Sequence, residues 1–505
     1  MKYIPVIGME IHAELKTASK MFCSCPNGYE LSEKPNQNIC PVCMGHPGTL
    51  PNMNQQAVEW TILVGLALNC QIAKFTKFDR KNYFYPDLPK GYQVSQYDQP
   101  LTFDGHLKIN GKTVDIIRIH LEEDTGKLVH DGAGALVDLT RAGTPLIELV
   151  TSPCLESAQE AKEFCQAYQQ ILRYLEVSEA DMEKGQMRCE ANVSMQEVGR
   201  FIIEGHDINP LLDYRLNPKS ELKNINSFRA LERAIEFEIV RQTKALENGD
   251  KLIQETRGWD EKTQTTFSQR SKETAADYRY FPEPDLPPLS ISDNLVTKLR
   301  ATLPELPFDK LERFISQYQF DLDTAKVLVS DKNLASYAEQ VISEMIEWIS
   351  SASDKSGEQV LHDEGPKISK LISNWLVNRL LKHLNEEKIS PQDSKINPEN
   401  FAELMTLIYE GQVNNLAAQQ ILEEMFNTGR DPKTIMNEKN LGQMGDEKEL
   451  EKIIDKILSD NPKALIDLKA GKENALKFLV GQAMRETKGT ANPQIINDLL
   501  QKKLN

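Results

Sequence analysis

The sequence lacks long apolar runs, an excess of positive charge and a high density of cysteine. Its longest apolar stretch, around residues 61–68, is far shorter than the roughly 20 residues that cross a bilayer, which argues against a membrane protein. The formal net charge of -16 argues against non-specific coating of nucleic acid, because phosphate neutralisation requires clustered Lys and Arg. Any contact with RNA must therefore be local.

Cysteine usage and the absence of common motifs narrow the possibilities further. Eight cysteines are spread over 505 residues and no secretory or transit signal is present, so we expect reduced thiols in a cytoplasmic protein. The sequence contains no G-x-x-x-x-G-K-[ST] phosphate loop, no kinase signature, no H-E-x-x-H and no G-x-S-x-G elbow. The common NTPase and zinc-protease interpretations therefore fail.

Length and periodicity predict an α+β protein of about three domains. Period-two alternation with many turn residues runs to about Pro288 and predicts a large mixed sheet with a few helices. Apolar spacings of three and four follow, and they predict helices. We expect domains at residues 1–291, 292–396 and 397–505. The polar segment 350–367 is expected to be a loop.

Three predicted strands each place charged side chains on one face. Alternation in VIGMEIHAELKT, VDIIRIHLEEDTGK and MRCEANVSM puts apolar residues on the opposite face of each strand. The charged faces carry Glu10, His12 and Glu14; Arg118, His120, Glu122 and Asp124; and Arg188 and Glu190.

Together these faces predict a site for a hard cation, because Mg²⁺ takes a few carboxylates along with water and substrate phosphate. Such a site is typical of phosphoryl transfer. The alternative is a solvated sheet face whose charges pair across strands, and only geometry distinguishes the two.

Two further segments offer groups for phosphate or a nucleoside. The segment FDRKNYFYPDLPKGYQ interleaves Arg80, Lys81 and Lys90 with aromatic residues that include Tyr83. The alternative is a surface loop packed by its own aromatic rings. The segment ELKNINSF supplies donors from Lys223, Asn224 and Ser227.

Four cysteines form a C-x-C pair and a C-x-x-C pair separated by fourteen residues, at Cys23, Cys25, Cys40 and Cys43. This spacing predicts a structural tetrahedral zinc site. The alternative is four buried thiols without a ligand.

Near the C-terminus, ENALKFLVGQAMRETKG places apolar residues at helical spacing, with Lys477, Arg485 and Lys488 off that face. A cationic helix of this kind predicts a shape-directed contact with an RNA backbone. The alternative is a solvated basic face.

Several long segments resemble the GatB family of amidotransferase B subunits. They are VIGMEIHAELKT, PGTLP, FDRKNYFYPDLPKGYQVSQYDQP, LEEDTGK, RAGTPLIELVT, MRCEANVS, ELKNINSF, QETRGWD, DYRYFPEPDLPPL and the C-terminal KFLVGQAMRETKGTANP. The resemblance runs through the whole chain and implies a cradle-shaped catalytic domain, a helical connector and a helical tail similar to the YqeY family.

The resemblance also implies an activity. Members of the family act as ATP-dependent carbon–nitrogen ligases that phosphorylate the side-chain carboxylate of Glu-tRNA(Gln) or Asp-tRNA(Asn). Ammonia from glutamine then gives Gln-tRNA(Gln) or Asn-tRNA(Asn). The glutaminase is a separate amidase A subunit, and with a small C subunit the three form a heterotrimer.

Carried onto matching positions, the resemblance implies that Glu10, His12, Glu190 and either Glu122 or Glu123 surround Mg²⁺. Strand parity favours Glu122, and a bulge would reverse that choice. Arg80, Lys81 and Lys90 would lie near ATP phosphate or the tRNA end, and zinc would be structural. Two rivals stay open: a tRNA-docking subunit without catalysis, and a ligase that acts on a free metabolite.

Overall fold

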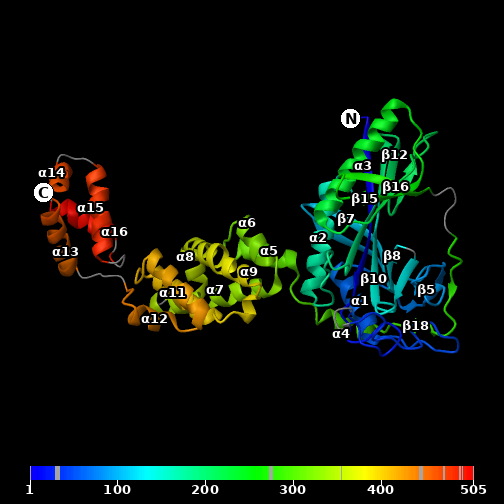
Figure 1. Ribbon diagram of the computed structural model, residues 1–505, viewed down its shortest axis with the longest axis horizontal. Helices are drawn as coiled ribbons and strands as arrows, with labels where there is room; N and C mark the ends of the chain where they lie inside the picture. The colour runs from blue at the N-terminus through cyan, green and yellow to red at the C-terminus, as the bar shows by residue number, and fades with distance from the viewer. Residues whose placement is uncertain are drawn as a thin grey trace. The chain divides into compact units, whose positions relative to one another are not determined.

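The computed structural model describes residues 2–28, 34–132, 134–271, 277–353, 355–442, 447–469, 473–487, 491 and 493–503. Its contacts divide the chain into two units, Met1–Leu306 and Pro307–Asn505. The first is built on a large sheet and the second on helices (Figure 1). This confirms the predicted α+β class.

A mixed sheet forms the centre of the first unit. In spatial order its strands within the described residues are β16 (Thr265–Ser271), β15 (Glu255–Asp260), β14 (Ser220–Lys223), β11 (Met187–Glu197), β1 (Tyr3–Glu14), β10 (Pro145–Thr151), β7 (Lys112–Glu123), β6 (Thr102–Ile109) and β2 (Gln71–Ile72). The β14–β15 pair is parallel and the other neighbours are antiparallel. Strands from distant parts of the sequence therefore lie side by side.

The central strand β1 has two chemically different faces. Ile7, Met9 and Ile11 are almost completely buried, whereas Glu10 and His12 alternate with them on the opposite face. Antiparallel pairing to β10 and β11 keeps this alternation in register across the sheet. One face is thus a core and the other is free to carry polar groups.

Helices cover the apolar face. The helices of the first unit are α1 (Gln55–Ala67), α2 (Ala158–Tyr174), α3 (Phe228–Asn248) and α4 (Asp293–Arg300). Helices α2 and α3 pack on each other, α2 contacts β1 and β6, and α3 contacts β11 (Figure 1). Ser157 and Ser227 start these two helices by accepting a backbone N–H, a cap that typically contributes about 1 kcal/mol.

Shorter strands complete the first unit. They are β3 (Phe75–Thr76), β4 (Asp79–Asn82), β5 (Tyr92–Ser95), β8 (Lys127–Asp131), β9 (Gly134–Asp138), β12 (Phe201–Glu204), β13 (Asp207–Pro210), β17 (Phe281–Pro282) and β18 (Leu289–Ser290). Strands β17, β4 and β5 form a small sheet, and β5 contacts β7 of the large sheet. The small sheet therefore brings the Arg80–Lys81 segment next to the large one.

The second unit consists of helices. They are α5 (Pro307–Ser316), α6 (Leu322–Val329), α7 (Lys332–Ser353), α8 (Gly357–Ile372), a π-helix η2 (Ser373–Leu380), α9 (Leu381–Glu387), η3 (Pro391–Asp393), α10 (Pro398–Tyr409), α11 (Asn415–Thr428), α12 (Pro432–Glu438), α13 (Glu447–Asp460), α14 (Pro462–Lys469), α15 (Glu473–Glu486) and α16 (Pro493–Lys502). Helix α10 packs on α7. Buried apolar residues of the last four helices form a core of their own.

One expectation about this unit was wrong. The segment 350–367, expected to be a loop, instead contains the end of α7 and the first turns of α8. Helix α8 begins at a capping box in which Ser356 and Gln359 satisfy each other's backbone N–H groups. Burial of Val360 and Ile368 then outweighs the poor helix propensity of Gly365 and Pro366.

The predicted domain boundaries, between residues 291 and 292 and between residues 396 and 397, stay predictions. As for the membrane, no helix among the described residues combines the length and the apolar character that a bilayer crossing requires.

Candidate active site

A row of polar side chains crosses four strands on the open face of the sheet. His12 of β1 lies opposite Arg188 of β11 on one side and Glu148 of β10 on the other, and Glu148 lies opposite His120 of β7. Directly opposed residues in antiparallel strands hold their side chains about 5 Å apart. Four residues far apart in sequence are therefore neighbours in space.

The side chains of this row contact each other closely. His12 Nε2 lies 3.2 Å from Glu148 Oε2 and 3.4 Å from Glu122 Oε1. His120 Nε2 lies 3.4 Å from the same Glu148 oxygen. Next to the row, Glu10 lies opposite Glu190. Carboxylate and imidazole donors form three groups here that share members, and the donor atoms of each group lie close enough together to hold one metal ion. The groups are Glu10, His12 and Glu148; His120, Glu122 and Glu148; and Glu10, Glu190 and Glu221.

These groups line a cavity of about 470 Å³, a volume suited to a small ligand or the end of a larger one. The cavity takes in most of the site residues predicted from sequence. Glu10, His12, Lys81, Tyr83, Arg118, Glu122, Glu190 and Lys223 all line it.

The cavity holds more negative than positive charge. Its described lining has six carboxylates against four Lys and Arg side chains. Burial, reinforced by the charge of Glu148, raises the pKa of Glu10. Burial alone would lower the pKa of His12, but the hydrogen bond to Glu148 and the charges of Glu148 and Glu122 raise it to about 9. The negative charge of Glu148 contributes to both shifts, and a bound cation would offset that charge.

Two lysines approach the carboxylates from different strands. Lys223 of β14 lies 2.7 Å from Glu190 Oε2 and 3.0 Å from Glu221 Oε1. Lys81 of β4 lies 5.2 Å from the centroid of the Tyr278 ring and makes no ion pair within the described ranges. Burial would lower the pKa of Lys81, but the charges of Glu122 and Glu148 raise it. Lys81 is therefore a charged donor that is free to meet a ligand.

The structure separates the two candidate carboxylates on β7. Glu122 lies in the cavity and accepts a hydrogen bond from Ser95 Oγ at 3.2 Å. Glu123 points the other way, where it pairs with Lys90 and accepts the backbone N–H of Val94 at 3.0 Å. The β7–β10 register is regular at both residues, so no bulge reverses the strand parity.

Four other predicted residues lie outside the cavity lining, and the protein already uses their polar atoms. Arg80 donates to both oxygens of Glu283 at 2.7 Å, and its guanidinium lies 4.3 Å from the centroid of the Tyr92 ring. Lys90 is held by Glu123. Asn224 donates to the backbone oxygen of Trp259 at 3.3 Å, and Ser227 caps α3.

The sequence interpretation missed several residues of the cavity. The most central is Glu148, which belongs to two of the donor groups. Glu221, Tyr278 and Tyr280 also line the cavity. A signal for Glu148 was available, because the apolar strand PLIELVT carries a single acid at its centre. The two tyrosines come from a segment whose position depends on pairing with β4.

The four predicted cysteines meet in space. All four Sγ atoms lie within 4.8 Å of one another. A hydrogen bond from Cys23 lowers the pKa of Cys43 to about 5, and Lys20 Nζ lies 3.8 Å from the same sulfur. Sulfur donors at tetrahedral zinc, with Zn–S near 2.3 Å, stand about 3.8 Å apart. The donor set and its spacing therefore fit zinc.

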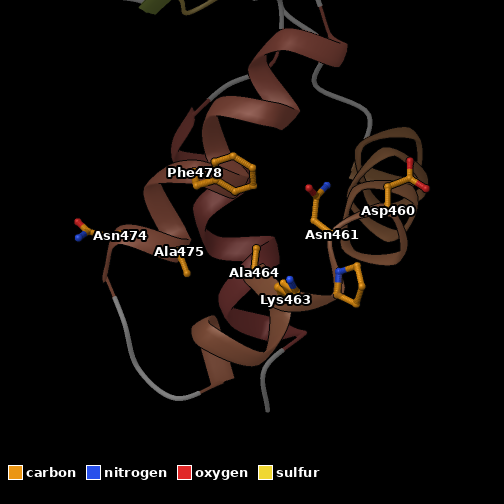
Figure 2. A pocket seen from close by; sticks show the side chains of 8 residues that line it. Asp460, Asn461, Lys463, Ala464, Asn474, Ala475 and Phe478 are labelled. Atoms are coloured by element: carbon orange, nitrogen blue, oxygen red, sulfur yellow. The ribbon is translucent and has the colours of Figure 1, made fainter.

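The helical tail has a cavity of different character. Its volume is about 530 Å³, and side chains from α13, α14 and α15, including Asp460, Ala464 and Phe478, line it (Figure 2). It has no cluster of carboxylates and imidazoles. On α15, Lys477 and Arg485 are exposed, as expected, whereas Lys488 lies outside the described residues.

A Ser–His–Asp contact occurs elsewhere in the first unit. Ser152 Oγ lies 2.6 Å from His206 Nδ1, and His206 Nε2 lies 2.9 Å from Asp104 Oδ1. A nucleophile must be reachable by its substrate, but Ser152 is completely buried. This contact therefore anchors the β12–β13 hairpin to the sheet rather than forming a hydrolase site.

Comparison with known proteins agrees with this geometry. Residues 5–297 match the GatB/GatE catalytic domain and residues 358–504 match the GatB domain. The chain is 44% identical over its full length to the whole B subunit of the aspartyl/glutamyl-tRNA(Asn/Gln) amidotransferase from Persephonella marina. It is 46% identical over 100% of its length to 99% of the protein of the same name from Thermotoga maritima. The chain belongs to the GatB family of amidotransferase B subunits.

Proposed function

We propose that this chain is the kinase and amide-forming subunit of a tRNA-dependent amidotransferase. It would phosphorylate the side-chain carboxylate of Glu-tRNA(Gln) or Asp-tRNA(Asn) with ATP and then convert it to the amide. The observation that carries the proposal is the cluster of Glu10, His12, Glu122 and Glu148 in one cavity beside the unpaired Lys81. The membership in the GatB family agrees with it.

The donor set of the cavity suits Mg²⁺, because it consists of carboxylate oxygens with an imidazole and carries excess negative charge. Glu10, His12, Glu122 and Glu148 would hold the ion, with Glu190 on the neighbouring strand as the further ligand expected from sequence. When bound, Mg²⁺ neutralises phosphate charge during transfer. Glu148 extends the set that the sequence predicted.

The chemistry proceeds in two balanced steps. A side-chain carboxylate oxygen of the aminoacyl group attacks the γ-phosphorus of ATP, the bond to the β-phosphate oxygen breaks, and ADP leaves. Ammonia then attacks the carbonyl carbon of the acyl phosphate. Inorganic phosphate leaves, one proton is lost from nitrogen, and the amide remains. The first step is needed because a free carboxylate is a poor acyl donor.

The cations of the cavity would handle the phosphate. Lys81 makes no ion pair within the described residues and contacts only the face of the Tyr278 ring, so it is the first candidate to meet the γ-phosphate. Lys223 is shared between Glu190 and Glu221 and would hold those carboxylates in place. Tyr83 and Arg118 also line the cavity, where they would orient the aminoacyl end.

We further propose that ammonia comes from an amidase A subunit, with a small C subunit completing a cytoplasmic heterotrimer. The completely buried Ser152 makes its Ser–His–Asp contact unsuitable for hydrolysing glutamine, which fits a partner doing that half. Structural zinc at the four cysteines and a tRNA contact through the tail belong to the same proposal.

The test is amide formation by the purified chain with its partner subunits, ATP and Glu-tRNA(Gln). ADP release that requires the aminoacyl-tRNA and stops in Glu10→Ala and Glu190→Ala is the expected result. ADP release that persists in both variants, with tRNA binding intact, would instead favour a docking subunit without catalysis. Turnover without tRNA would point to a ligase for a free metabolite.

A further inference from the structure

A lysine is buried beside the four cysteines. Lys20 is 1% exposed, so its ammonium group does not reach water, although lysine side chains usually extend theirs to the solvent. Its Nζ donates to Cys43 Sγ at 3.8 Å. A buried charge costs free energy unless it is paired, so the group that faces Lys20 has to supply negative charge.

Carboxylates do not supply that charge. Within the part of the chain that the structure describes, Lys20 makes no ion pair with Asp or Glu. Lys16, four residues earlier, shows the usual arrangement, because it reaches the solvent and pairs with Glu179 at 2.8 Å. The partner that the described residues offer to the Lys20 ammonium is therefore the sulfur of Cys43.

The backbone around Lys20 is held on several sides. Its N–H donates to the backbone oxygen of Cys25 at 3.0 Å, and its carbonyl oxygen accepts a hydrogen bond from Asn54 Nδ2 at 3.3 Å. The following N–H, that of Met21, donates to the backbone oxygen of Gly143 at 2.7 Å. These bonds fix the position from which the side chain extends toward the cysteine cluster.

Zinc held by four cysteines carries an excess of negative charge. Four thiolates around Zn²⁺ leave two negative charges uncompensated. Such charge is costly where water is excluded, and one ammonium group beside Cys43 offsets half of it. Groups that donate to the ligands of a metal ion also tune its affinity. Lys20 is therefore placed to complement the loaded centre.

We propose that Lys20 is the internal counter-ion of the zinc centre, a positioning residue that does not bind the metal but strengthens its binding by the four thiolates. Zinc and Lys20 then depend on each other. Zinc keeps the sulfurs deprotonated, which supplies the negative charge beside the ammonium, and the ammonium offsets charge that zinc leaves. The inference rests on the zinc proposed above for the four cysteines and assigns Lys20 no part in phosphate or ammonia transfer.

The test measures zinc affinity and thermal unfolding of the full-length chain. Lys20→Met removes the charge but keeps an unbranched side chain of similar length. Lys108→Met, at an exposed lysine of β6, controls for the loss of a positive charge. Each protein is stripped of metal and titrated with Zn²⁺ in competition with a chromogenic chelator. Unfolding temperatures are recorded for the zinc-free and the zinc-loaded forms.

We expect Lys20→Met to bind Zn²⁺ about tenfold more weakly than wild type, whereas Lys108→Met binds it equally well. Zinc-free Lys20→Met should unfold at the wild-type temperature or above it, since replacing a buried charged pair by an apolar side chain is often neutral or stabilising. Equal zinc affinity of wild type and Lys20→Met would overturn the proposal. A lower unfolding temperature of the zinc-free variant would overturn it as well, because Lys20 would then act by packing.

A second comparison removes the sulfur that faces Lys20. Cys43→Ser deletes a zinc ligand and, with it, the anion beside the ammonium. Adding Lys20→Met to Cys43→Ser should raise the unfolding temperature by several degrees, because the double variant no longer buries an unpaired charge. A double variant that unfolds no higher than Cys43→Ser would contradict the proposal. Wild-type protein that binds no zinc would remove the metal site and this inference together, whereas unchanged zinc affinity of Lys20→Met removes this inference alone.

Discussion

Among the described residues of the first unit, side chains suited to hold a metal ion gather at the four cysteines and in the acidic cavity, and these two clusters are built in opposite ways. The cysteine cluster uses sulfur atoms from two short segments that lie close in sequence. The acidic cluster uses oxygen and imidazole donors from strands as far apart as β1 and β11. The sulfur donors suit a tightly held zinc ion. The oxygen and imidazole donors suit Mg²⁺, which keeps some of its coordination positions for water and substrate phosphate.

This difference explains how well each cluster can be predicted. A turn brings Cys40 and Cys43 together regardless of the rest of the fold, and Gly45 closes that turn with a φ of +70°. The acidic cluster exists only after strands have paired in one register, because a one-residue slip would turn Glu148 away from His12. The sequence therefore predicts all four members of the local, cysteine cluster, whereas its prediction of the distributed, acidic cluster lacks Glu148.

The largest expected effect tests that missed member. We expect Glu148→Gln to lower kcat/KM for amide formation by about 10³-fold, because the change removes a charge shared by His12 and His120. The measurement is ADP release and amide formation by the assembled complex.

Glu123→Gln is the matched control. It is the same substitution at a residue of β7 that pairs with Lys90 and lies outside the acidic cavity. It should lower stability while leaving activity within about tenfold of wild type. Equal activity of the two variants would show that the distributed cluster is not the catalytic centre.

The next prediction concerns the local cluster. Freshly purified protein should contain one zinc per chain, and Cys40→Ser should lose it and destabilise the first unit by several kcal/mol, since structural zinc contributes directly to folding. Elemental analysis and thermal unfolding measure the two effects. Cys154→Ser, outside the cluster, should keep its zinc. If Cys40→Ser lacks zinc but unfolds at the same temperature as the wild-type protein, the cysteine cluster is not a structural metal site.

Much of the architecture followed from the sequence, for reasons that particular residues make clear. Alternation in β1 gave both the buried face of Ile7 and the polar face of Glu10. In β4, Lys81 faces the cavity and Arg80 faces Glu283, a distinction that requires knowing which side of the small sheet meets the large one. Helix α8 was missed because Gly365 and Pro366 suggested a loop, whereas tertiary packing decided otherwise.

A smaller effect is expected at Glu238, a buried carboxylate whose oxygens accept hydrogen bonds from the protein, in contrast to the carboxylates of the acidic cavity. Glu238 accepts from Arg241 at 2.6 Å and from Gln242 at 2.8 Å. Burial would raise the pKa of Glu238, but its bonds to Arg241 and Gln242 lower it. In contrast, burial raises the pKa of Glu10, and the charges of the neighbouring carboxylates Glu148 and Glu190 raise it further.

A depressed folded-state pKa means that Glu238 stabilises the protein above its ordinary pKa of 4.5, and that this contribution is lost as the pH falls through the folded value. Glu238→Gln should cost about 3 kcal/mol at pH 7 and less at pH 4. Unfolding measured at both pH values checks this. A cost that is the same at both would show that the charge of Glu238 contributes nothing.

The smallest expected effect lies in the tail, which carries neither cluster and would act through binding alone. A cut at Asn397 is a poor test, because it removes α10, whose Phe401 packs against Tyr337 with ring centroids 6.0 Å apart. A cut after Gly442 instead removes the last four helices, which share a core of their own.

We expect this truncation to raise KM for aminoacyl-tRNA about tenfold and to leave kcat and assembly with the amidase partner intact, because remote contacts contribute to substrate positioning. Lys477→Ala/Arg485→Ala should reproduce part of the increase and weaken the salt dependence of tRNA binding, since both side chains are exposed on α15. Unchanged tRNA affinity of the truncated complex at every salt concentration would show that the tail does not contact tRNA. A loss of kcat instead would mean that the tail supports the acidic cavity itself.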